Sequence, residues 1–360
     1  MTQTRLAIVG GGIIGRTHAD AIRACPGSDL VAIVDPFESG KSLAKDLECP
    51  HLETLAALIG LHPDGVIIAT PNALHVPQAM TLIRAGIPVL VEKPLGDTAH
   101  SCAALVALSD RTGVQGLVGH HRRHNPIVQA AKTVVTEGRF GTLVSGTISA
   151  TLYKDARYFD VAWRREPGAG GPILINLIHE IDLVRHLFGE ITEVTALTSN
   201  SQRGFDVEDT AAVILRLETG GLITIALTDA GVGPWCWDTT AGENPARFPA
   251  MPAVSHMFAG TQAGMSLPDL SFWTHEGPRD WTVPQVNRPL DRVATDSYIE
   301  QIRHFAAVIK GNETPRITLS DGARNIAVIE AIRGSITQRR PVPLGTHRIN
   351  TSPKPKAMME

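Results

Sequence analysis

Two stretches of the sequence carry side chains that could move a proton during a reaction. In the first, VEKP (91–94), Lys93 ends an apolar run of strand length, so its ammonium group is poorly solvated. Low-dielectric walls and a neighbouring cation would lower the pKa of this lysine, as a general base requires. Pro94 restricts the backbone beyond it, and a cis peptide there would aim Lys93 into a cleft, a point that the sequence leaves open. The alternative is a lysine at a strand end that extends to solvent.

The second stretch, IHEID (178–182), places His179 on a segment typical of a buried helix. Taken by itself, this pattern favours a polar residue packed in a core over a catalytic proton carrier. Asp182 follows about one helical turn later, and we expect it to be a structural or orienting group rather than a base. The role of His179 therefore depends on the rest of the chain.

A glycine-rich turn near residue 10 could hold a dinucleotide. GGGIIG contains Gly10, Gly12 and Gly15 in the spacing GxGxxG, with Ile13 and Ile14 before the last glycine. The turn follows a strand directly and opens a helix, so a pyrophosphate could approach the backbone at the helix N-terminus. The alternative is a glycine turn that serves only chain reversal.

Two further features extend this interpretation. Asp35 ends the next apolar run, where its carboxylate could accept both ribose hydroxyls of an adenosine and would repel a 2′-phosphate. We therefore expect NAD as the cofactor rather than NADP. TPNALH (70–75) follows another strand: Thr70 is kept out of the helical region by Pro71, Asn72 could cap the next helix, and His75 lies in its first turn. A simple helix cap and a set of cofactor contacts remain equally open there.

The elements that must position these residues alternate between strand and helix before residue 122. Apolar runs of strand length stand at 5–10, 30–35, 64–70, 88–94 and 115–121, separated by segments with helical spacing. This alternation predicts βαβ units and a parallel sheet buried on both faces. Such sheets bind ligands beyond the carboxyl ends of their strands. The polar or glycine residues at those ends are Gly10, Asp35, Thr70, Glu92, Lys93 and His121.

After residue 122 the pattern changes to longer β-rich segments. They are 142–153, 191–200, 209–218 and 221–230, the last two joined by a hairpin turn in LETGG, with a helix before them at 124–138. They predict an α+β domain built on a large, open, mainly antiparallel sheet. Residues 231–290 show no clear pattern, and helices return at about 296–310 and 319–337. We divide the chain into an NAD(P)-binding domain at 1–121, a substrate-binding and oligomerisation domain at 122–344, and a polar tail at 345–360.

Composition narrows the functional class. The chain has 360 residues, too many for one hydrophobic core, and 33 Lys and Arg against 36 Asp and Glu argue against a nucleic-acid surface. No apolar run approaches the roughly 18 residues that span a membrane, and we expect no signal peptide before the glycine turn. The four cysteines match no zinc pattern, and we expect reduced thiols in a cytoplasmic protein that binds no metal.

Several motifs together resemble one known family. They are GxGxxGxxHA (10–19), TPNALH, EKPLG (92–96), the HRR segment (121–123), WR (163–164) and GGP…HEIDLVRHLFGE (170–190). This combination resembles the glucose–fructose oxidoreductase, inositol dehydrogenase and MocA family, over nearly the whole chain. The resemblance implies a Rossmann domain, a doubly wound parallel sheet in an α/β fold, joined to a C-terminal domain with an open sheet. It also implies oxidation or reduction of a secondary alcohol with NAD(P).

The resemblance assigns roles to individual residues. In the family, the lysine of EKP and the histidine of HxID face the reacting carbinol, which here implies Lys93 and His179 as the acid/base pair. Many members carry an aspartate four residues before the histidine, but here that position is Ile175, followed by Asn176. On a helix, Asn176 would still lie near the face of His179 and reach the substrate, but it cannot accept a proton as a carboxylate does.

The resemblance also implies contacts around this pair. His121 and Arg122 would lie near the nicotinamide and the substrate, and Arg122 could bind an anionic substrate group, although a solvated helix start is equally open. The resemblance further implies that the substrate pocket is shaped by Tyr153, Lys154, Arg157 and Tyr158. The full set of expected cofactor contacts is Gly10, Gly12, Ile13, Ile14, Gly15, Asp35, Thr70, Asn72, His75, Glu92, Lys93, His121, Trp163, Arg164 and Tyr298.

Three functions compete. The leading hypothesis is an NAD-dependent oxidoreductase that transfers a hydride between nicotinamide and a secondary alcohol of a sugar, an inositol-like cyclitol or a sugar acid. An NAD-assisted glycosidase, which oxidises the sugar only transiently, is the second. A non-catalytic NAD(P)-binding sensor is the third, and the missing family aspartate favours it while Lys93 and His179 oppose it. We expect a small-molecule substrate, no nucleic acid, no membrane contact, and a homodimer or homotetramer by resemblance.

Overall fold

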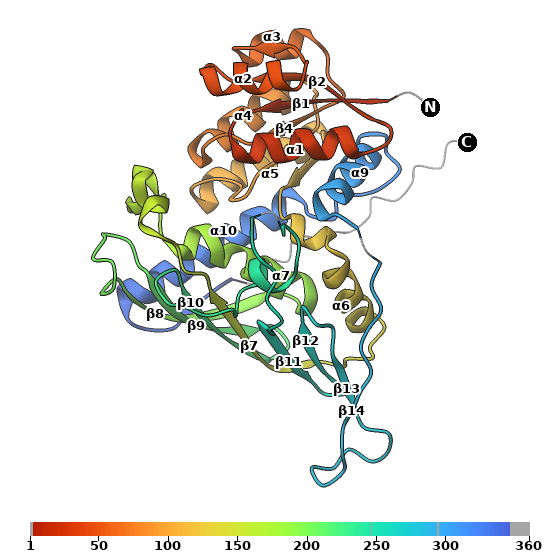
Figure 1. The fold of residues 1–360 in the computed structure, drawn as a ribbon, viewed down its shortest axis with the longest axis vertical. Coiled ribbons are helices and arrows are strands. Elements are labelled where there is room, and N and C mark those ends of the chain that lie inside the picture. The colour runs from red at the N-terminus through yellow and green to blue at the C-terminus, as the bar shows by residue number, and fades with distance from the viewer. Residues whose placement is uncertain (1–2, 246, 294, 346–360) are drawn as a thin grey trace.

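The computed structural model describes residues 3–245, 247–293 and 295–345, which form two sheets with helices between and around them (Figure 1). The first sheet has six strands and the second has nine. Of the predicted tail at 345–360, all but Gly345 lies outside the described residues. In the described part of the chain, no helix combines the length and the apolar character needed to cross a membrane.

The first sheet is the predicted parallel sheet. Its strands follow the order β3-β2-β1-β4-β5-β6, and every pair is parallel. The strands β4, β5 and β6 are buried at every residue because helices cover both faces. The bounds are β1 Thr4–Val9, β2 Ser28–Val34, β3 His51–Leu52, β4 Gly65–Ile68, β5 Val89–Val91 and β6 Gly116–Val118. The doubly wound order confirms the predicted Rossmann fold.

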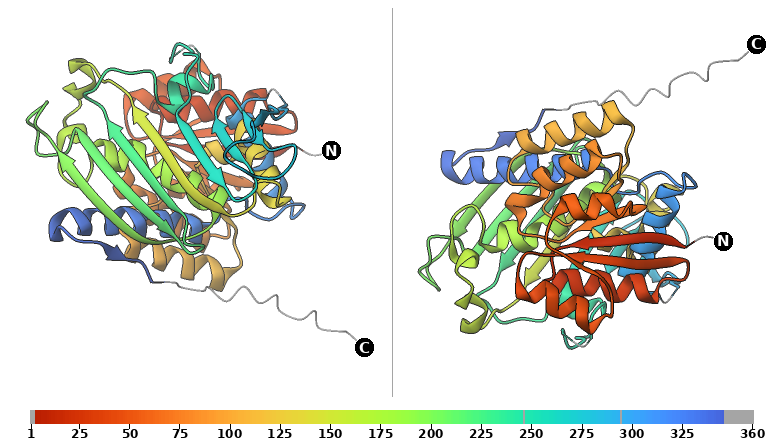
Figure 2. Two further views of the ribbon diagram at one scale, coloured as in Figure 1. Left: turned by 90° about the horizontal axis from the view of Figure 1, so that it is seen from below. Right: turned by 90° about the horizontal axis from the view of Figure 1, so that it is seen from above.

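Helices connect these strands across the sheet, as the view from above shows (Figure 2, right). Thr54 and Thr98 cap α3 and α5 with their side chains, and α5 ends at Gly113, whose φ of 72° suits glycine. The helices are α1 Ile13–Ala24, α2 Glu38–Asp46, α3 Leu55–Gly60, α4 Asn72–Arg84 and α5 Ala99–Thr112.

The second sheet is mixed and mostly antiparallel, in the order β14-β13-β12-β11-β7-β10-β9-β8-β15. Only β7 and β10 run parallel among the pairs described, and β9 and β10 form the predicted hairpin. Alternate residues along β9 and β10 are buried and exposed, because one face packs on helices and the other is open (Figure 2, left). The main strands are β7 Leu143–Thr151, β8 Ile191–Ser199, β9 Thr210–Leu217 and β10 Leu222–Thr228.

Residues 231–290, which showed no pattern in the sequence, supply one end of this sheet. The strands there are short, between two and five residues, so too few positions alternate to give a signal. They are β11 His256–Gly260, β12 Gly264–Leu267, β13 Phe272–Thr274 and β14 Val286–Asn287, with the helical turn α8 Trp237–Thr240 before them; β15 Val342–Pro343 closes the opposite edge.

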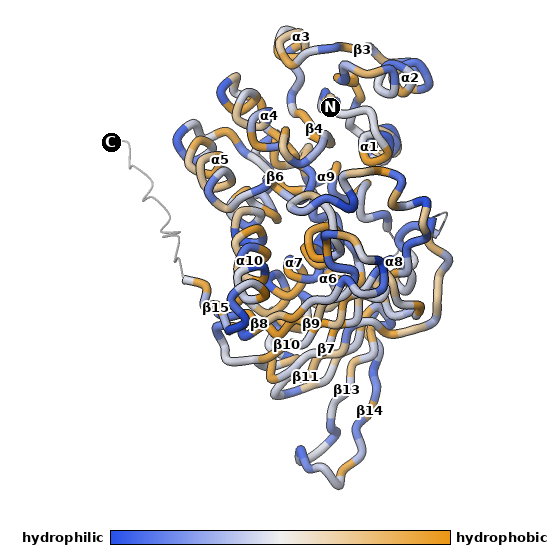
Figure 3. Tube along the Cα trace, turned by 90° about the vertical axis from the view of Figure 1, so that its left-hand side faces the viewer, coloured by the Kyte–Doolittle hydropathy of each residue, from blue (hydrophilic) through white to orange (hydrophobic). Residues whose placement is uncertain are grey.

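The helix α7 lies between the two sheets, in the middle of the molecule (Figures 1 and 3). Two later helices return to the first sheet: α9 packs against α1, and α10 packs against α5 and β8. Phe305 on α9 is fully buried in the same cluster as Leu6 and Ile8 of β1. The remaining elements are α6 Pro126–Thr136, α7 Ile178–Phe188, α9 Ser297–Ile309, α10 Leu319–Gln338, the 3-10 turns η1 His121–His124, η2 Ala156–Asp160 and η3 Ala162–Arg165, and the π-helical turn η4 Ile173–Leu177.

Candidate active site

The glycine turn leaves room for a dinucleotide at the start of α1. A Cβ at Gly10, where φ is 104°, would lie 2.5 Å from the carbonyl oxygen of Ala69, and one at Gly15 would lie 2.0 Å from that of Gly10. At Gly12, by contrast, no atom of the described chain lies within 4 Å of the Cβ position. Crowding below the turn and open space above it suit a pyrophosphate on the helix N-terminus, beside Ile13 and Ile14.

Asp35 lies directly after β2, next to this turn. Its Oδ2 accepts a hydrogen bond from the backbone N–H of Gly11 at 2.7 Å, and its Oδ1 accepts one from Phe37 at 2.8 Å. Each oxygen keeps a lone pair, so the carboxylate can still receive two ribose hydroxyls while its charge opposes a 2′-phosphate.

Replacing Asp35 by Asn tests this assignment. The change keeps one acceptor oxygen but removes the charge, so the ratio of the NADP dissociation constant to that of NAD should fall by about tenfold or more. Calorimetric titration with both cofactors measures the ratio. An unchanged ratio would mean that Asp35 does not face the adenosine ribose.

The TPN turn and the EKP turn are tied together by His75. Its ring nitrogens lie 2.8 Å from the carbonyl oxygen of Thr70 and 2.7 Å from that of Pro94, and the side chain is buried. These contacts leave the ring no open nitrogen for a cofactor. The predicted cap at Asn72 is wrong, because α4 begins at Asn72 itself and Pro71 is its cap residue, with no side-chain hydrogen bond.

The EKP turn carries two charged side chains with separate partners. The buried Glu92 accepts from His18 across a distance of 2.8 Å, and its other oxygen accepts from the backbone N–H of Lys93 at 3.1 Å. Burial raises the pKa of Glu92, but the hydrogen bond and charge of His18 outweigh it and hold the pKa at about 2. Glu92 is therefore ionised, and its hydrogen bond with the backbone N–H of Lys93 stabilises the turn that carries Lys93. The peptide bond between Lys93 and Pro94 is cis.

The Lys93 side chain crosses from the first sheet to the segment before α7. Its Nζ lies 3.4 Å from the carbonyl oxygen of Ile175, in the π-helical turn η4. A π-helical turn frees backbone carbonyls from the regular ladder, and such turns recur at functional sites. Burial lowers the pKa of Lys93. The charge of Glu92 raises it, but by less, so the pKa stays below its usual value.

His179 lies at the start of α7, one turn beyond that carbonyl. The residue is 8% exposed, and its Nδ1 has no hydrogen-bond partner among the described residues. Burial, followed by the charges of Lys93 and Arg122, lowers the pKa of His179 well below its usual value, so the imidazole is neutral near pH 7. A neutral imidazole has one donor and one acceptor nitrogen, so the ring can accept or share a proton.

Asn176 belongs to the same π-helical turn. Its Oδ1 accepts a hydrogen bond from Lys154 Nζ at 2.7 Å. The side chain of Asn176 is therefore held by a second lysine.

The HRR segment (121–123) begins next to His179. The ring of His121 stacks on Tyr298 with centroids 4.4 Å apart and meets His179 edge to face at 5.6 Å. This geometry places the expected cofactor contacts His121 and Tyr298 next to the candidate acid/base pair.

Arg122 corrects the expectation of an anion-binding arginine. Its guanidinium is 3% exposed, and it donates to Glu180 at 2.7 Å and to Asp238 at 3.2 Å. Two carboxylates therefore occupy the guanidinium N–H groups of Arg122 that a substrate carboxylate would need. The pKa of Glu180 is held at about 2 because the charges of Arg122 and His256 outweigh its burial, so the pair is ionised and structural.

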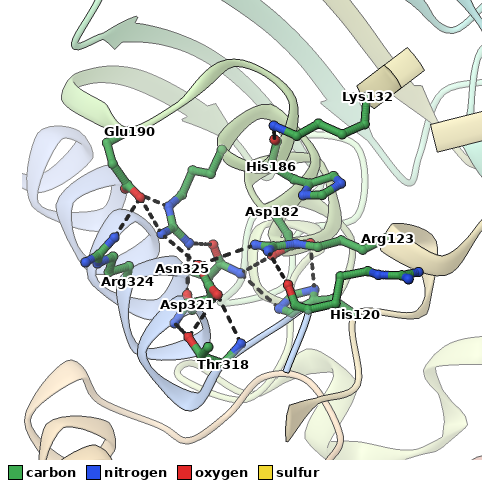
Figure 4. A network of polar contacts seen from close by, with 12 residues as sticks. His120, Arg123, Lys132, Asp182, His186, Glu190, Thr318, Asp321, Arg324 and Asn325 are labelled. Carbon is green, nitrogen blue, oxygen red and sulfur yellow. Dashed lines mark hydrogen bonds and ion pairs between the residues drawn. The ribbon is translucent and has the colours of Figure 1, made fainter. Parts of the chain in front are cut away.

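A buried polar network ties α7 to α10 and to the HRR segment (Figure 4). Arg123 donates two hydrogen bonds to Asp182, at 2.9 and 2.7 Å, and Asn325 of α10 donates to Asp182 at 2.7 Å and to His120 at 3.0 Å. The His120 ring in turn packs edge to face on His179, with centroids 6.1 Å apart. Asp182 is thus bound as a structural group, which fits the interpretation made from sequence.

The remaining expected residues lie along the loop after β7. The guanidinium of Arg164 covers the ring of Tyr158 at 4.1 Å and donates to its carbonyl oxygen, while Trp163 is 42% exposed. Tyr153 is 55% exposed, and the guanidinium carbon of Arg203 lies 5.7 Å from the centre of its ring.

Sequence reasoning misses three charged residues that line or support this site. Glu243, in the unassigned segment, accepts from Asn125, Trp237 and Ser297, and no local pattern could have indicated it. Glu180 belongs to the IHEID motif and His18 to the glycine motif. The residues that they contact, His256 and Glu92, lie far away in the sequence. Lys154, by contrast, is expected in the substrate pocket from the resemblance; it lies three residues after β7 and donates to Asn176.

Comparison with protein families covers most of the chain. Residues 4–120 match the model described as an oxidoreductase family with an NAD-binding Rossmann fold. Residues 128–240 match a GFO/IDH/MocA C-terminal domain, and residues 257–344 match an oxidoreductase family C-terminal alpha/beta domain.

Individual relatives agree with this match. The chain is 30% identical to inositol 2-dehydrogenase of Acidothermus cellulolyticus over 67% of this chain and 71% of the relative. It is also 30% identical to 2,7-anhydro-N-acetylneuraminate hydratase of Escherichia coli, where the match spans 61% of this chain and only 60% of the relative's length. The fold is shared with the WlbA dehydrogenase of Bordetella pertussis, solved with NADH and UDP-GlcNAcA, at a TM-score of 0.76 and 21% identity, over 95% of this chain and 99% of that one.

Proposed function

The chain belongs to the GFO/IDH/MocA family of NAD-binding oxidoreductases, and from this premise we propose that it interconverts a secondary alcohol and a ketone of a sugar, cyclitol or sugar acid, with Lys93 and His179 sharing the proton. One observation carries the proposal. Lys93, two residues after β5, reaches the carbonyl oxygen of Ile175, which lies one helical turn before His179 at the start of α7, and the charge of Lys93 acts on the pKa of His179.

The properties of the two side chains support this division of work. Burial lowers the pKa of Lys93, which makes its ammonium group easier to deprotonate, and the resulting amine could remove the hydroxyl proton of an alcohol. The neutral His179 offers a hydrogen bond to the same oxygen as its charge develops. Bound NAD would supply the hydride acceptor, and the open space above Gly12 together with Asp35 fits its pyrophosphate and ribose.

A second candidate has no net redox change. The family includes a relative named as a hydratase, so part of this fold supports chemistry other than dehydrogenation. An NAD-assisted glycosidase would use the same Lys93 and His179 but would return the hydride to its product. A sensor without chemistry is disfavoured, because it would need neither a buried, unpartnered imidazole nitrogen nor a half-buried lysine.

The proposal also covers the oligomeric state and the cellular location of the protein. Cross-strand pairing places Ile214, Thr224, Thr147 and Met257 in one row on the open face of the second sheet. Ile214 is 47% exposed and Met257 is 53% exposed, so apolar area on this face supports a homodimer or homotetramer. All four cysteines are free thiols, which supports a cytoplasmic location.

The test is a panel of inositols, aldoses and sugar acids mixed with pure protein and NAD or NADP. We expect NADH to appear with one class of compound, and to appear faster with NAD than with NADP. Release of an aglycone without net NADH would favour the glycosidase. No reaction of either kind with a protein that binds NAD tightly would argue against catalysis.

A further inference from the structure

Lys154 is a buried charged residue to which the proposed reaction gives no task. It follows β7, where its backbone N–H donates to the carbonyl oxygen of Asp229 at 2.9 Å and its own carbonyl oxygen accepts from Arg203 at 2.8 Å. The side chain is 8% exposed. These backbone contacts fix the backbone position of Lys154, which limits the positions that its ammonium group can reach.

The ammonium group reaches the same turn as Lys93. Lys154 Nζ donates to Asn176 Oδ1 at 2.7 Å, whereas Lys93 Nζ reaches the carbonyl oxygen of the preceding residue. The ring of Tyr158 lies 4.5 Å from the ammonium nitrogen on another side. A lysine has three N–H donors, and among the described residues only Asn176 accepts one of them.

The charge of Lys154 is only partly compensated. Asp229 Oδ2 lies 3.8 Å away, beyond hydrogen-bond distance, and Asp229 is already bound through Oδ1 to Arg203 at 2.8 Å. Burial lowers the pKa of Lys154 to about 8, with Asp229 opposing and Lys93 adding to the shift, so the group is still mainly an ammonium near pH 7. An aspartate at position 176 would neutralise it, but Asn176 cannot.

We propose that Lys154 binds a carboxylate of the substrate and that the substrate is therefore a sugar acid or a similar polyhydroxy acid. The inference rests on the proposed function, since it concerns the same site. Lys154 would hold the carboxylate while Lys93 faces the carbinol one or a few carbons away. Asn176 would keep the lysine in place without cancelling its charge.

A carboxylate fits the donors better than a phosphate does. A carboxylate carries one charge, which one partly compensated ammonium group can balance. A phosphate monoester carries close to two charges and favours guanidinium forks, and the nearby fork of Arg122 is held by Glu180 and Asp238.

The experiment measures kcat/KM for matched pairs of substrates: D-glucuronate against D-glucose, D-galacturonate against D-galactose, and glucose 6-phosphate as the phosphate arm. Wild type should prefer an acid to its neutral partner. In Lys154→Gln the acid-to-neutral ratio should fall by about 30-fold, the size of one charge-assisted hydrogen bond. Lys154→Arg should retain most of the preference.

Asn176→Asp provides a matched second variant, since it keeps the lysine but adds a carboxylate that neutralises it. Its acid-to-neutral ratio should also fall by at least tenfold. A ratio that stays within threefold of wild type in both Lys154→Gln and Asn176→Asp overturns the inference. So does a wild type that prefers neutral sugars or glucose 6-phosphate.

A binding measurement separates this inference from the proposed function. Calorimetry with NADH-loaded protein should show D-glucuronate binding more tightly than D-glucose, and Lys154→Gln should remove the difference. If this result appears without turnover of any compound, the carboxylate site stands and the proposed reaction falls. If wild type shows no difference in affinity, the carboxylate site falls whether or not another compound reacts.

Discussion

Replacing Lys93 by Met should lower kcat by about a thousandfold, the size of a general acid–base contribution, while the NAD dissociation constant stays within about threefold. Methionine keeps the length of the side chain but can neither accept a proton nor donate to the Ile175 carbonyl oxygen. The expected effect is on kcat because we propose that Lys93 faces the carbinol and not the adenosine half of the cofactor. Steady-state kinetics and cofactor titration measure the two quantities.

Lys132→Met is the matched control for this variant. Lys132 is also partly buried, also has a pKa lowered by burial, and also donates to a backbone carbonyl oxygen, that of His186 at 2.7 Å. It lies on α6, away from the turn at Ile175, so kcat should remain within about twofold of wild type. A Lys93→Met enzyme with kcat within tenfold of wild type would contradict the assignment of the base.

Arg123→Met should destabilise the protein by about 3–5 kcal/mol, because it leaves the buried carboxylate of Asp182 without its cation. Asp182 is 1% exposed, and the charge of Arg123 is the main factor that opposes its burial and keeps its pKa far below the usual range. The loss should appear in urea-induced unfolding as a lower midpoint. Arg16→Met, which removes an ion pair with Asp46 at the surface, should cost less than about 1 kcal/mol.

A double variant sharpens this test. Removing both charges, in Arg123→Met combined with Asp182→Leu, should recover part of the lost stability, since no unpaired buried charge then remains. If Arg123→Met costs no more than Arg16→Met, the network in Figure 4 does not hold α7 as described.

The first sheet could be predicted from the sequence because its determinants are local. Strands buried on both faces give continuous apolar runs, and the glycine spacing and Asp35 mark the ends of two of them. The hairpin between β9 and β10 was equally accessible, since period-two alternation flanks a glycine turn. The position of Lys93 at the carboxyl end of β5 follows from the same pattern.

The rest depends on contacts between distant segments. Arg122 looks available in the sequence, and only the fold shows that Glu180 and Asp238 hold it. The pairing of Lys154 with Asn176 requires the end of β7 to meet the π-helical turn, which no local spacing indicates. The short strands β11 to β14 are held by pairing across the sheet, so their own residues carry too little pattern.

The most direct test of the central claim follows a hydrogen isotope from the substrate to the cofactor. The most active compound of the panel is prepared with deuterium at the reacting carbinol carbon, and the cofactor is analysed by mass spectrometry after reaction with NAD. We predict one deuterium in each reduced cofactor with wild type, and transfer slowed about a thousandfold in Lys93→Met. Product formation without deuterium in the cofactor, or equal transfer rates in the two proteins, would contradict hydride transfer at the Lys93–His179 site.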